Sequence, residues 1–309
     1  MKMKNILIII NKSWEVEPLL SAMTAMKIKP VGFPYPSKLN TPIPQPLDSS
    51  KSGKQDKCRA IFEITQKDPV NQVETLIVKA TVWCIEDIMD PAINSSSSGE
   101  KASKLPMVFN GEQNVDLVIA FGTAAFNDKD ASFNGSLVIG SEFFTYNAHD
   151  DNAESQFKHP LLGKYLKCNL SEDRRKSIFK IIDDKFKDVV ESKLVLTPNE
   201  QAKKTKVLAA SNYVAISNIN ITDPNDFAWA DEAGINDYTK TGEKSPIGSI
   251  ETTHGVIRLA SELPIIFVSA ITDRLTRFAS EVTPSQNYIA SFNGGILLSH
   301  LIPALGSIK

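Results

Sequence analysis

The chain has 309 residues, of which 42% are hydrophobic, with 34 basic and 36 acidic side chains and a net charge of −2 at pH 7. A nearly neutral chain with scattered basic residues lacks the electrostatic footprint of a nucleic-acid binder, so we expect no nucleic-acid partner. No apolar run reaches the roughly 20 residues that cross a bilayer, so we expect a soluble protein with no membrane partner. The 3 widely spaced cysteines fit neither a disulfide framework nor a paired metal motif, which favours a cytoplasmic location.

The first part of the chain predicts a strand, a helix and a hairpin. Residues 4–10 form a continuous β-branched run, typical of a parallel strand that is buried on both faces. A helix follows this run, and residues 60–64 and 74–84 have the pattern of a hairpin. Residues 30–57 are rich in proline and polar side chains, which predicts a long loop insertion. A second loop insertion, solvated and rich in serine, is expected at about residues 90–104.

The rest of the chain alternates strand-like and helix-like segments. Strands are predicted at residues 115–121, 135–139, 213–221 and 264–272, and helices at residues 171–190, 199–210, 251–262 and 284–301. This alternation, without an internal repeat, predicts an α/β fold: a three-layer α/β/α arrangement around a mixed, largely parallel central sheet. We expect a single domain over residues 1–309, because strand-like residues resume after each insertion.

Polar residues that follow the buried runs are the first candidates for a functional site, because ligands of open α/β sheets gather at the carboxyl ends of the strands. Glu15 follows the first run, and Thr123 follows residues 115–121. Glu251 and Asp273 follow two later runs. For each residue alone, helix capping explains a polar side chain as well as ligand binding does. Their common place at one edge of the sheet favours a site.

The order and context of these segments resemble the nucleoside phosphorylase and methylthioadenosine/S-adenosylhomocysteine nucleosidase superfamily, with this chain as a divergent member. In the first half of the chain, the family's acidic helix start corresponds to residues 15–18, and its G-[ST]-A-G turn to residues 122–125. Its G-D-[IL]-V strand corresponds to residues 135–139, and its Y-x-x-x-D segment to residues 146–150. Near the end of the chain, its M-E-[AT]-x-A helix start corresponds to residues 250–255, and its P-x-x-x-[IV]-R-x-I-S-D strand end to residues 264–273. Each motif is short, and together they span most of the chain in the correct order. The resemblance implies a phosphorylase-like fold.

The resemblance also implies an enzyme that cleaves the N-glycosidic bond of a purine nucleoside or thionucleoside. Asp273 would protonate the leaving base, Glu251 would hold the ribose hydroxyls, and Glu15 would orient the attacking water. Burial disfavours an ionised carboxylate, so the end of an apolar strand suits an acid. Thr123 and Gly122 would contact the substrate. Phe227 is the candidate for stacking on the base, and residues 217–221 are the alternative segment.

Departures from the family's patterns indicate whether water or phosphate takes up the sugar when the bond is cleaved. Residues 87–103 occupy the place of a Gly-rich turn that approaches phosphate or the nucleophile in relatives, and Ala120 stands where several phosphorylases carry a phosphate-binding arginine. Water is therefore the expected acceptor, which makes the chain a hydrolase. A phosphate-dependent phosphorylase, which is a glycosyltransferase, and a non-catalytic nucleoside-binding relative are the alternatives.

No cofactor is expected, and the expected partners are a small-molecule nucleoside and further copies of the chain. His149 lies beside Asp150 and Asp151, but this group lacks the spaced second ligand of a metal site, so we expect no metal. The resemblance implies a homodimer or a higher homo-oligomer that completes the pocket.

Overall fold

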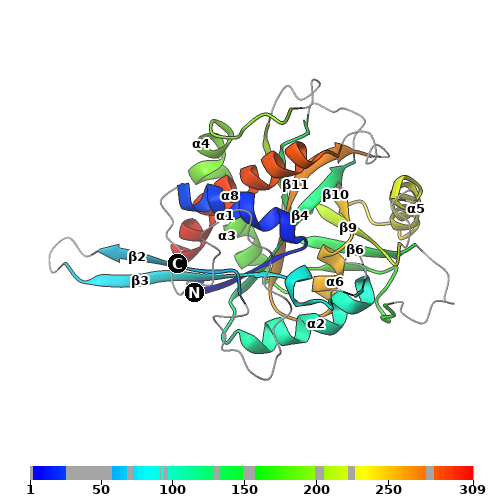
Figure 1. The fold of residues 1–309 in the computed structure, drawn as a ribbon, viewed down its shortest axis with the longest axis horizontal. Helices are drawn as coiled ribbons and strands as arrows, with labels where there is room; N and C mark the ends of the chain where they lie inside the picture. Colours follow the sequence, from blue (N-terminus) through cyan, green and yellow to red (C-terminus); the bar gives the residue numbers. More distant parts are fainter. Residues whose placement is uncertain are drawn as a thin grey trace.

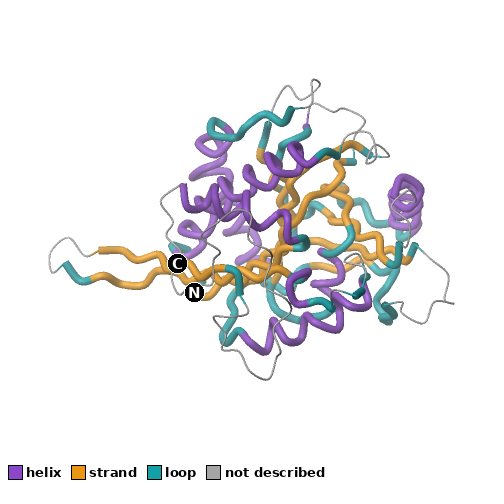
Figure 2. Tube along the Cα trace, viewed as in Figure 1, coloured by secondary structure: helices purple, strands orange, loops and turns teal. Residues whose placement is uncertain are grey.

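The described part of the chain is built around one mixed sheet with helices on both faces (Figure 1 and Figure 2). The computed structural model describes residues 3–25, 58–67, 72–90, 92–93, 97–127, 133–148, 157–198, 205–221, 227–275 and 282–308. The α/β class and the mixed, largely parallel sheet are as predicted. The proline-rich insertion at residues 30–57 lies outside the described residues.

The sheet of 11 strands contains more parallel than antiparallel neighbours. The strands are β1 (Asn5–Ile10), β2 (Ala60–Lys67), β3 (Glu74–Cys84), β4 (Leu117–Phe126), β5 (Leu137–Gly140), β6 (Glu142–Asn147), β7 (Tyr165–Lys167), β8 (Val207–Ala209), β9 (Val214–Ile219), β10 (Ile247–Glu251) and β11 (Ile265–Arg274). Their order is β2-β3-β1-β4-β10-β9-β6-β7, while β11 pairs with β4 and β5, and β8 pairs with β5. β4 therefore lies between parallel β1 and β11.

Helices cover the two faces of this sheet. They are α1 (Ser13–Ala25), the 3-10 turn η2 (Glu86–Ile88), α2 (Ser98–Gly111), α3 (Glu172–Ile181), the π-helical turn η4 (Ile182–Phe186), α4 (Lys187–Glu191), α5 (Phe227–Lys240), α6 (His254–Leu259) and α8 (Pro284–Gly306). α1, α3, α4 and α8 gather on one face, and α2 and α6 on the other (Figure 1). α5 packs against β6 and β9.

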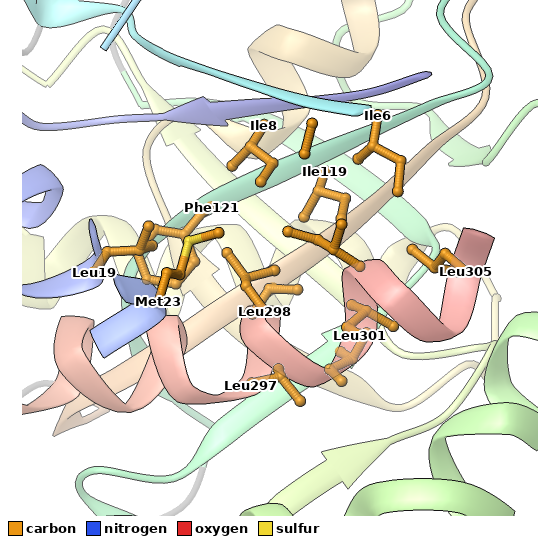
Figure 3. Packing of buried hydrophobic residues seen from close by; sticks show 14 of the residues in the cluster. Ile6, Ile8, Leu19, Met23, Ile119, Phe121, Leu297, Leu298, Leu301 and Leu305 are labelled. Atoms are coloured by element: carbon orange, nitrogen blue, oxygen red, sulfur yellow. The ribbon is translucent and has the colours of Figure 1, made fainter. Parts of the chain in front are cut away.

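The central strands are buried on both faces, as their continuous apolar runs predict. Ile6 and Ile8 of β1 pack with Phe121 of β4 in the cluster beneath α1 and α8 (Figure 3). Leu7 and Ile9 point to the opposite cluster, beneath α2 and α6. Because neighbouring side chains of a strand face opposite ways, one apolar run serves both clusters.

The predicted insertion at residues 90–104 is wrong in its second half, because residues 98–104 form the start of α2. Ser97 caps the helix, since its hydroxyl accepts the N–H of Glu100 at 3.3 Å. Lys101 and Leu105 are buried, one helical turn apart. The Ser97 cap and these two buried side chains hold the segment as a helix packed on the protein, although its composition is typical of a solvated loop.

Three further elements differ from the prediction. The predicted turn at residues 122–125 continues β4, because it pairs with β11 up to Phe126. The predicted helix at residues 199–210 is wrong over residues 207–209, which form β8 beside β5, while residues 199–204 lie outside the described part. The predicted helix at residues 251–262 is shorter, since Glu251 ends β10 and α6 covers His254–Leu259.

α8 is a core helix, although its length and mean hydropathy of 1.3 also suit a membrane-spanning segment. Of its most apolar stretch, 72% is buried inside the protein. Its apolar residues meet α1 and the sheet rather than solvent (Figure 3).

α1 and α8 approach most closely at Gly295. A Cβ on Gly295 would overlap the backbone carbonyl oxygen of Leu19 and lie 2.7 Å from the Cβ of Ala22. Backbone cannot move aside as a side chain can, so we expect Gly295→Ala to lower the free energy of unfolding by about 2 kcal/mol in urea titrations. Gly111→Ala is the matched control, because its new Cβ would meet Trp83 at an ordinary 3.6 Å. Equal stability of the two variants would contradict this packing.

Candidate active site

A cavity of about 320 Å³ opens at the carboxyl ends of the central strands. Its wall is formed by Asn11, Lys12, Trp14, Thr123, Ala124, Ala125, Phe227, Asp231, Ile250, Glu251, Thr252, Thr272, Asp273, Val282 and Asn287. The structure thus brings Thr123, Glu251, Asp273 and Phe227 together, as the sequence suggested. Glu15 and Gly122 are buried directly behind the wall rather than part of it.

The register of the sheet sets the spacing of the two carboxylates in the wall. Asp273 of β11 and Ile250 of β10 both pair with Ala125 of β4. Neighbouring strands lie about 4.8 Å apart, so Asp273 and the end of β10 are separated by roughly 10 Å. Ala125 between them presents only a methyl group, which leaves room for a ligand that reaches from one carboxylate to the other.

Glu251 is held rigidly by donors around the start of α6. Its Oε2 accepts the backbone N–H of Thr253 and, at 2.8 Å, that of His254. Its Oε1 accepts the hydroxyl of Ser217. The side chain is only 3% exposed, so these bonds replace water and fix the carboxylate at the cavity wall.

Glu15, in the first turn of α1, is fully buried. Its Oε1 accepts the N–H and the hydroxyl of Thr123 at 2.7 and 2.9 Å, and its Oε2 accepts the N–H of Lys12 at 2.9 Å. Burial outweighs these bonds and raises the pKa of Glu15 to about 7. Glu15 is therefore linked to the cavity by its hydrogen bond from the Thr123 hydroxyl.

Asp273 is joined by a second acid that the sequence did not reveal. Asp273 is 3% exposed and its Oδ1 accepts the hydroxyl of Thr272 at 2.8 Å. Asp231 of α5 is 7% exposed, and its Oδ1 accepts the amide of Asn218 at 2.8 Å. Burial, reinforced by the negative charge of Asp273, raises the pKa of Asp231 to about 7. Two acids therefore share the same side of the cavity.

Phe227 begins α5 and lies one helical turn before Asp231, so both side chains reach the cavity. Trp229, on another side of this helix, is 55% exposed and is not part of the wall. The alternative segment at residues 217–221 supports the wall from behind, since Ser217 bonds Glu251 and Asn218 bonds Asp231.

A third group missed in the sequence consists of Asn11, Lys101 and Thr253. The Lys101 ammonium donates to Asn11 Oδ1 and to Thr253 Oγ1, both at 2.8 Å, and the Thr253 hydroxyl donates to Asn11 Oδ1 at 2.8 Å. Lys101 is 0% exposed. Burial, with the positive charge of Lys12, lowers the pKa of Lys101 to about 7, although nearby carboxylates oppose this shift.

His254 is packed beneath the site. Its ring stacks on Phe267 with centroids 5.7 Å apart, and burial lowers its pKa. Its Nδ1 lies 3.5 Å from the hydroxyl of Ser269 and 3.8 Å from Glu251 Oε1, while no partner for Nε2 exists in the part of the chain that the structure describes. These contacts describe a neutral imidazole that supports Glu251.

The described residues contain no group of three His, Cys, Asp or Glu side chains that could hold a metal ion. His149, Asp150 and Asp151 lie outside them. Cys58, Cys84 and Cys168 are buried free thiols. Within the described wall the basic residue is Lys12, and no arginine contributes to it.

The chain has the fold of the methylthioadenosine/S-adenosylhomocysteine nucleosidases. It superposes on an MTA/SAH nucleosidase with a TM-score of 0.55 and 12% identity, covering 100% of this chain and 98% of that one. The Arabidopsis thaliana 5′-methylthioadenosine nucleosidase gives 0.53 and 12% over 100% and 98%. The Colwellia psychrerythraea MTA/SAH nucleosidase, in complex with adenine, gives 0.50 and 15% over 100% and 98%. No protein-family model and no curated protein matches the sequence.

The raised pKa of Asp231 predicts a stability that depends on pH. The native protein keeps a proton on Asp231 that the unfolded chain releases above pH 3.8, so this stabilisation is complete below that pH and is lost as the pH rises through about 7. Between pH 5 and 8 the wild type should lose about 3 kcal/mol more unfolding free energy than Asp231→Asn, which keeps the acceptor for Asn218. Asp237→Asn, on the same helix, is the control. Parallel pH curves of urea unfolding for wild type and Asp231→Asn would refute the buried acid.

Proposed function

We propose that this protein hydrolyses the N-glycosidic bond of a purine nucleoside or thionucleoside. The observation that carries the proposal is the pair of buried carboxylates, Asp273 and Glu251, that face one cavity across the small side chain of Ala125. A nucleoside needs one polar contact at its base and another at its sugar, with apolar surface between them. The likeness to nucleosidases, one of them bound to adenine, supports the same class of ligand.

Asp273 acts as the acid in this proposal. As the bond between the sugar and the base breaks, its electron pair moves onto the base, which takes a proton from the Asp273 carboxyl group. Thr272 donates to Asp273 Oδ1, and Asp273 is part of the cavity wall that the base would meet. Asp231 beside it holds a proton near pH 7 and so limits the negative charge at this end. Phe227 supplies an aromatic surface for the base.

Glu251 binds the sugar. Three donors fix its carboxylate, and the lone pair that remains on Oε1 can accept a ribose hydroxyl group in a charge-assisted hydrogen bond. Positive charge develops on the sugar as the bond breaks, so a negative carboxylate beside it stabilises the transition state more than the ground state.

Water is the acceptor. Phosphate binding usually requires several cationic donors, chiefly arginines, whereas Lys12 is the cationic side chain of the described wall and no arginine contributes to it. The Thr123 hydroxyl donates to Glu15 and its oxygen can accept a hydrogen bond from water at the same time, so it connects the attacking water to Glu15. Water then forms the new bond to the sugar carbon, and its proton passes through Thr123 to Glu15. By resemblance, a second copy of the chain completes the pocket.

Product analysis tests the reaction. Incubation with a panel of purine nucleosides and thionucleosides in phosphate-free buffer should release free base and free sugar, without a sugar 1-phosphate. Asp273→Asn should slow base release by roughly 10²–10⁴-fold with little change in thermal stability. Glu262→Gln, at an exposed carboxylate away from the cavity, is the control. Strict dependence on added phosphate would indicate a phosphorylase, and binding without base release would indicate a non-catalytic nucleoside-binding protein.

The sugar role of Glu251 predicts selectivity. Glu251→Gln should reduce kcat/KM for ribonucleosides by at least about 100-fold, because one charge-assisted acceptor is replaced by a donor. If this contact is made by the 2′-hydroxyl group, the loss for 2′-deoxyribonucleosides should be smaller by about 10-fold, since they lack that group. Equal losses on the two sugars would contradict a contact between Glu251 and the 2′-hydroxyl group.

A further inference from the structure

The cavity wall carries a donor that the proposed roles leave unused, the side-chain amide of Asn11. Asn11 is 6% exposed, follows β1 and lines the cavity. Its backbone N–H donates to Phe121 at 3.1 Å, which places it beside Gly122 and Thr123 of β4. Glu15 is buried behind this wall, so Asn11 meets a ligand directly where Glu15 does not.

The orientation of the Asn11 amide follows from its partners. In its protonated form, which the nearby carboxylates favour, Lys101 only donates hydrogen bonds, and the atom of Asn11 that faces it is the carbonyl oxygen. The hydroxyl of Thr253 donates to the same oxygen. The amide nitrogen therefore points the other way, and the described residues provide no acceptor for it. A donor held this way in a cavity wall is ready for a ligand oxygen.

This donor lies at the same end of the cavity as the Thr123 relay. Around Gly122, the Asn11 Cβ and the Glu15 Oε1 lie 3.5 and 3.7 Å from the point that a side chain would occupy. A water molecule that accepts from Asn11 and donates to Thr123 has one lone pair left in a fixed direction. Such a water is oriented for attack rather than merely bound.

We propose that the Asn11 side-chain amide donates to the nucleophilic oxygen that attacks the sugar, and that Lys101 is a positioning residue that holds this amide. The inference rests on the proposed hydrolysis and adds the group that binds the attacking water. Lys101 is itself absent from the cavity wall, so it acts through Asn11 and Thr253. Thr253 also donates its N–H to Glu251, which places the nucleophile and the sugar carboxylate on one connected frame.

The test compares Asn11→Ala, Asn11→Asp, Lys101→Met and the Asn11→Ala/Lys101→Met double variant in the base-release assay. Asn11→Asp keeps an acceptor for Lys101 and Thr253 but presents an oxygen to the cavity instead of a donor. Each single variant should lower kcat about 100-fold, with KM changed less than about 3-fold, because water rather than substrate is misplaced. Adenine affinity, measured by calorimetry, should stay within about 2-fold.

The double variant separates a positioning role from a structural one. Because Lys101 acts through Asn11, the double variant should be no slower than Asn11→Ala, whereas independent residues would give about a 10⁴-fold loss. Lys101→Met should melt at or above the wild-type temperature, since it removes a buried charge. Lys104→Met, at a partly exposed lysine on the same helix, is the control.

The outcomes distinguish this inference from the function on which it rests. An active wild type with normal kcat in the Asn11 variants, or with additive losses in the double variant, would overturn the inference and leave the hydrolase assignment standing. A wild type that releases no base from any nucleoside would overturn both. Slow, stable and non-additive variants that keep adenine affinity would establish the Asn11 donor and its Lys101 support.

Discussion

The site depends on one constraint, the position of the carboxyl end of β4 among three other strands. Parallel β1 and β11 flank β4, and antiparallel β10 meets its last residues at Ala125. β1 ends opposite Phe121, β11 continues beside β4 to Phe126, and β10 brings Glu251 to the same region from the opposite direction. The polar groups of the cavity lie at these strand ends or on a helix that follows one of them, except Asp231, which lies on α5 after β9. Small side chains at residues 122–125 keep the space between them open.

This arrangement buries ionisable groups, which lowers the free energy of unfolding because the groups lose their hydration. Glu15, Lys101 and Asp231 all have their pKa moved to about 7, chiefly by burial. A fold selected for stability alone would place apolar side chains at such positions, because removing a buried charge is often neutral or stabilising. The three groups surround one cavity, and perturbed acids and bases gather where protons must be moved. A pKa near neutrality suits a group that accepts or gives a proton, which is the role proposed for Glu15.

The sequence predicts the parts of the site that lie on strands. Glu251 and Asp273 follow continuous apolar runs, and such runs mark the buried strands whose ends carry ligands in α/β proteins. Asp231 was not predicted as a site residue, because α5 is rich in small and polar residues and has no clear apolar stripe. Lys101 was not predicted either, because its neighbours in the sequence have the composition of a solvated loop. Asn11 stands directly after β1, but only the partners that the fold brings to it show its amide to be a fixed donor.

The strand-end pattern that β11 resembles contains an arginine, and here that position is Ser269. Ser269 is buried and bonds the hydroxyl of Ser249 at 2.8 Å, so β11 carries no cation at this position. The negative charges of Glu251 and Glu15 favour the protonated form of Lys101, which is buried near both. Lys101 reaches this place from α2. Residues 98–104, whose composition is typical of a solvated loop, therefore contribute a charge to the site. They do so because they form the start of α2, which places Lys101 there.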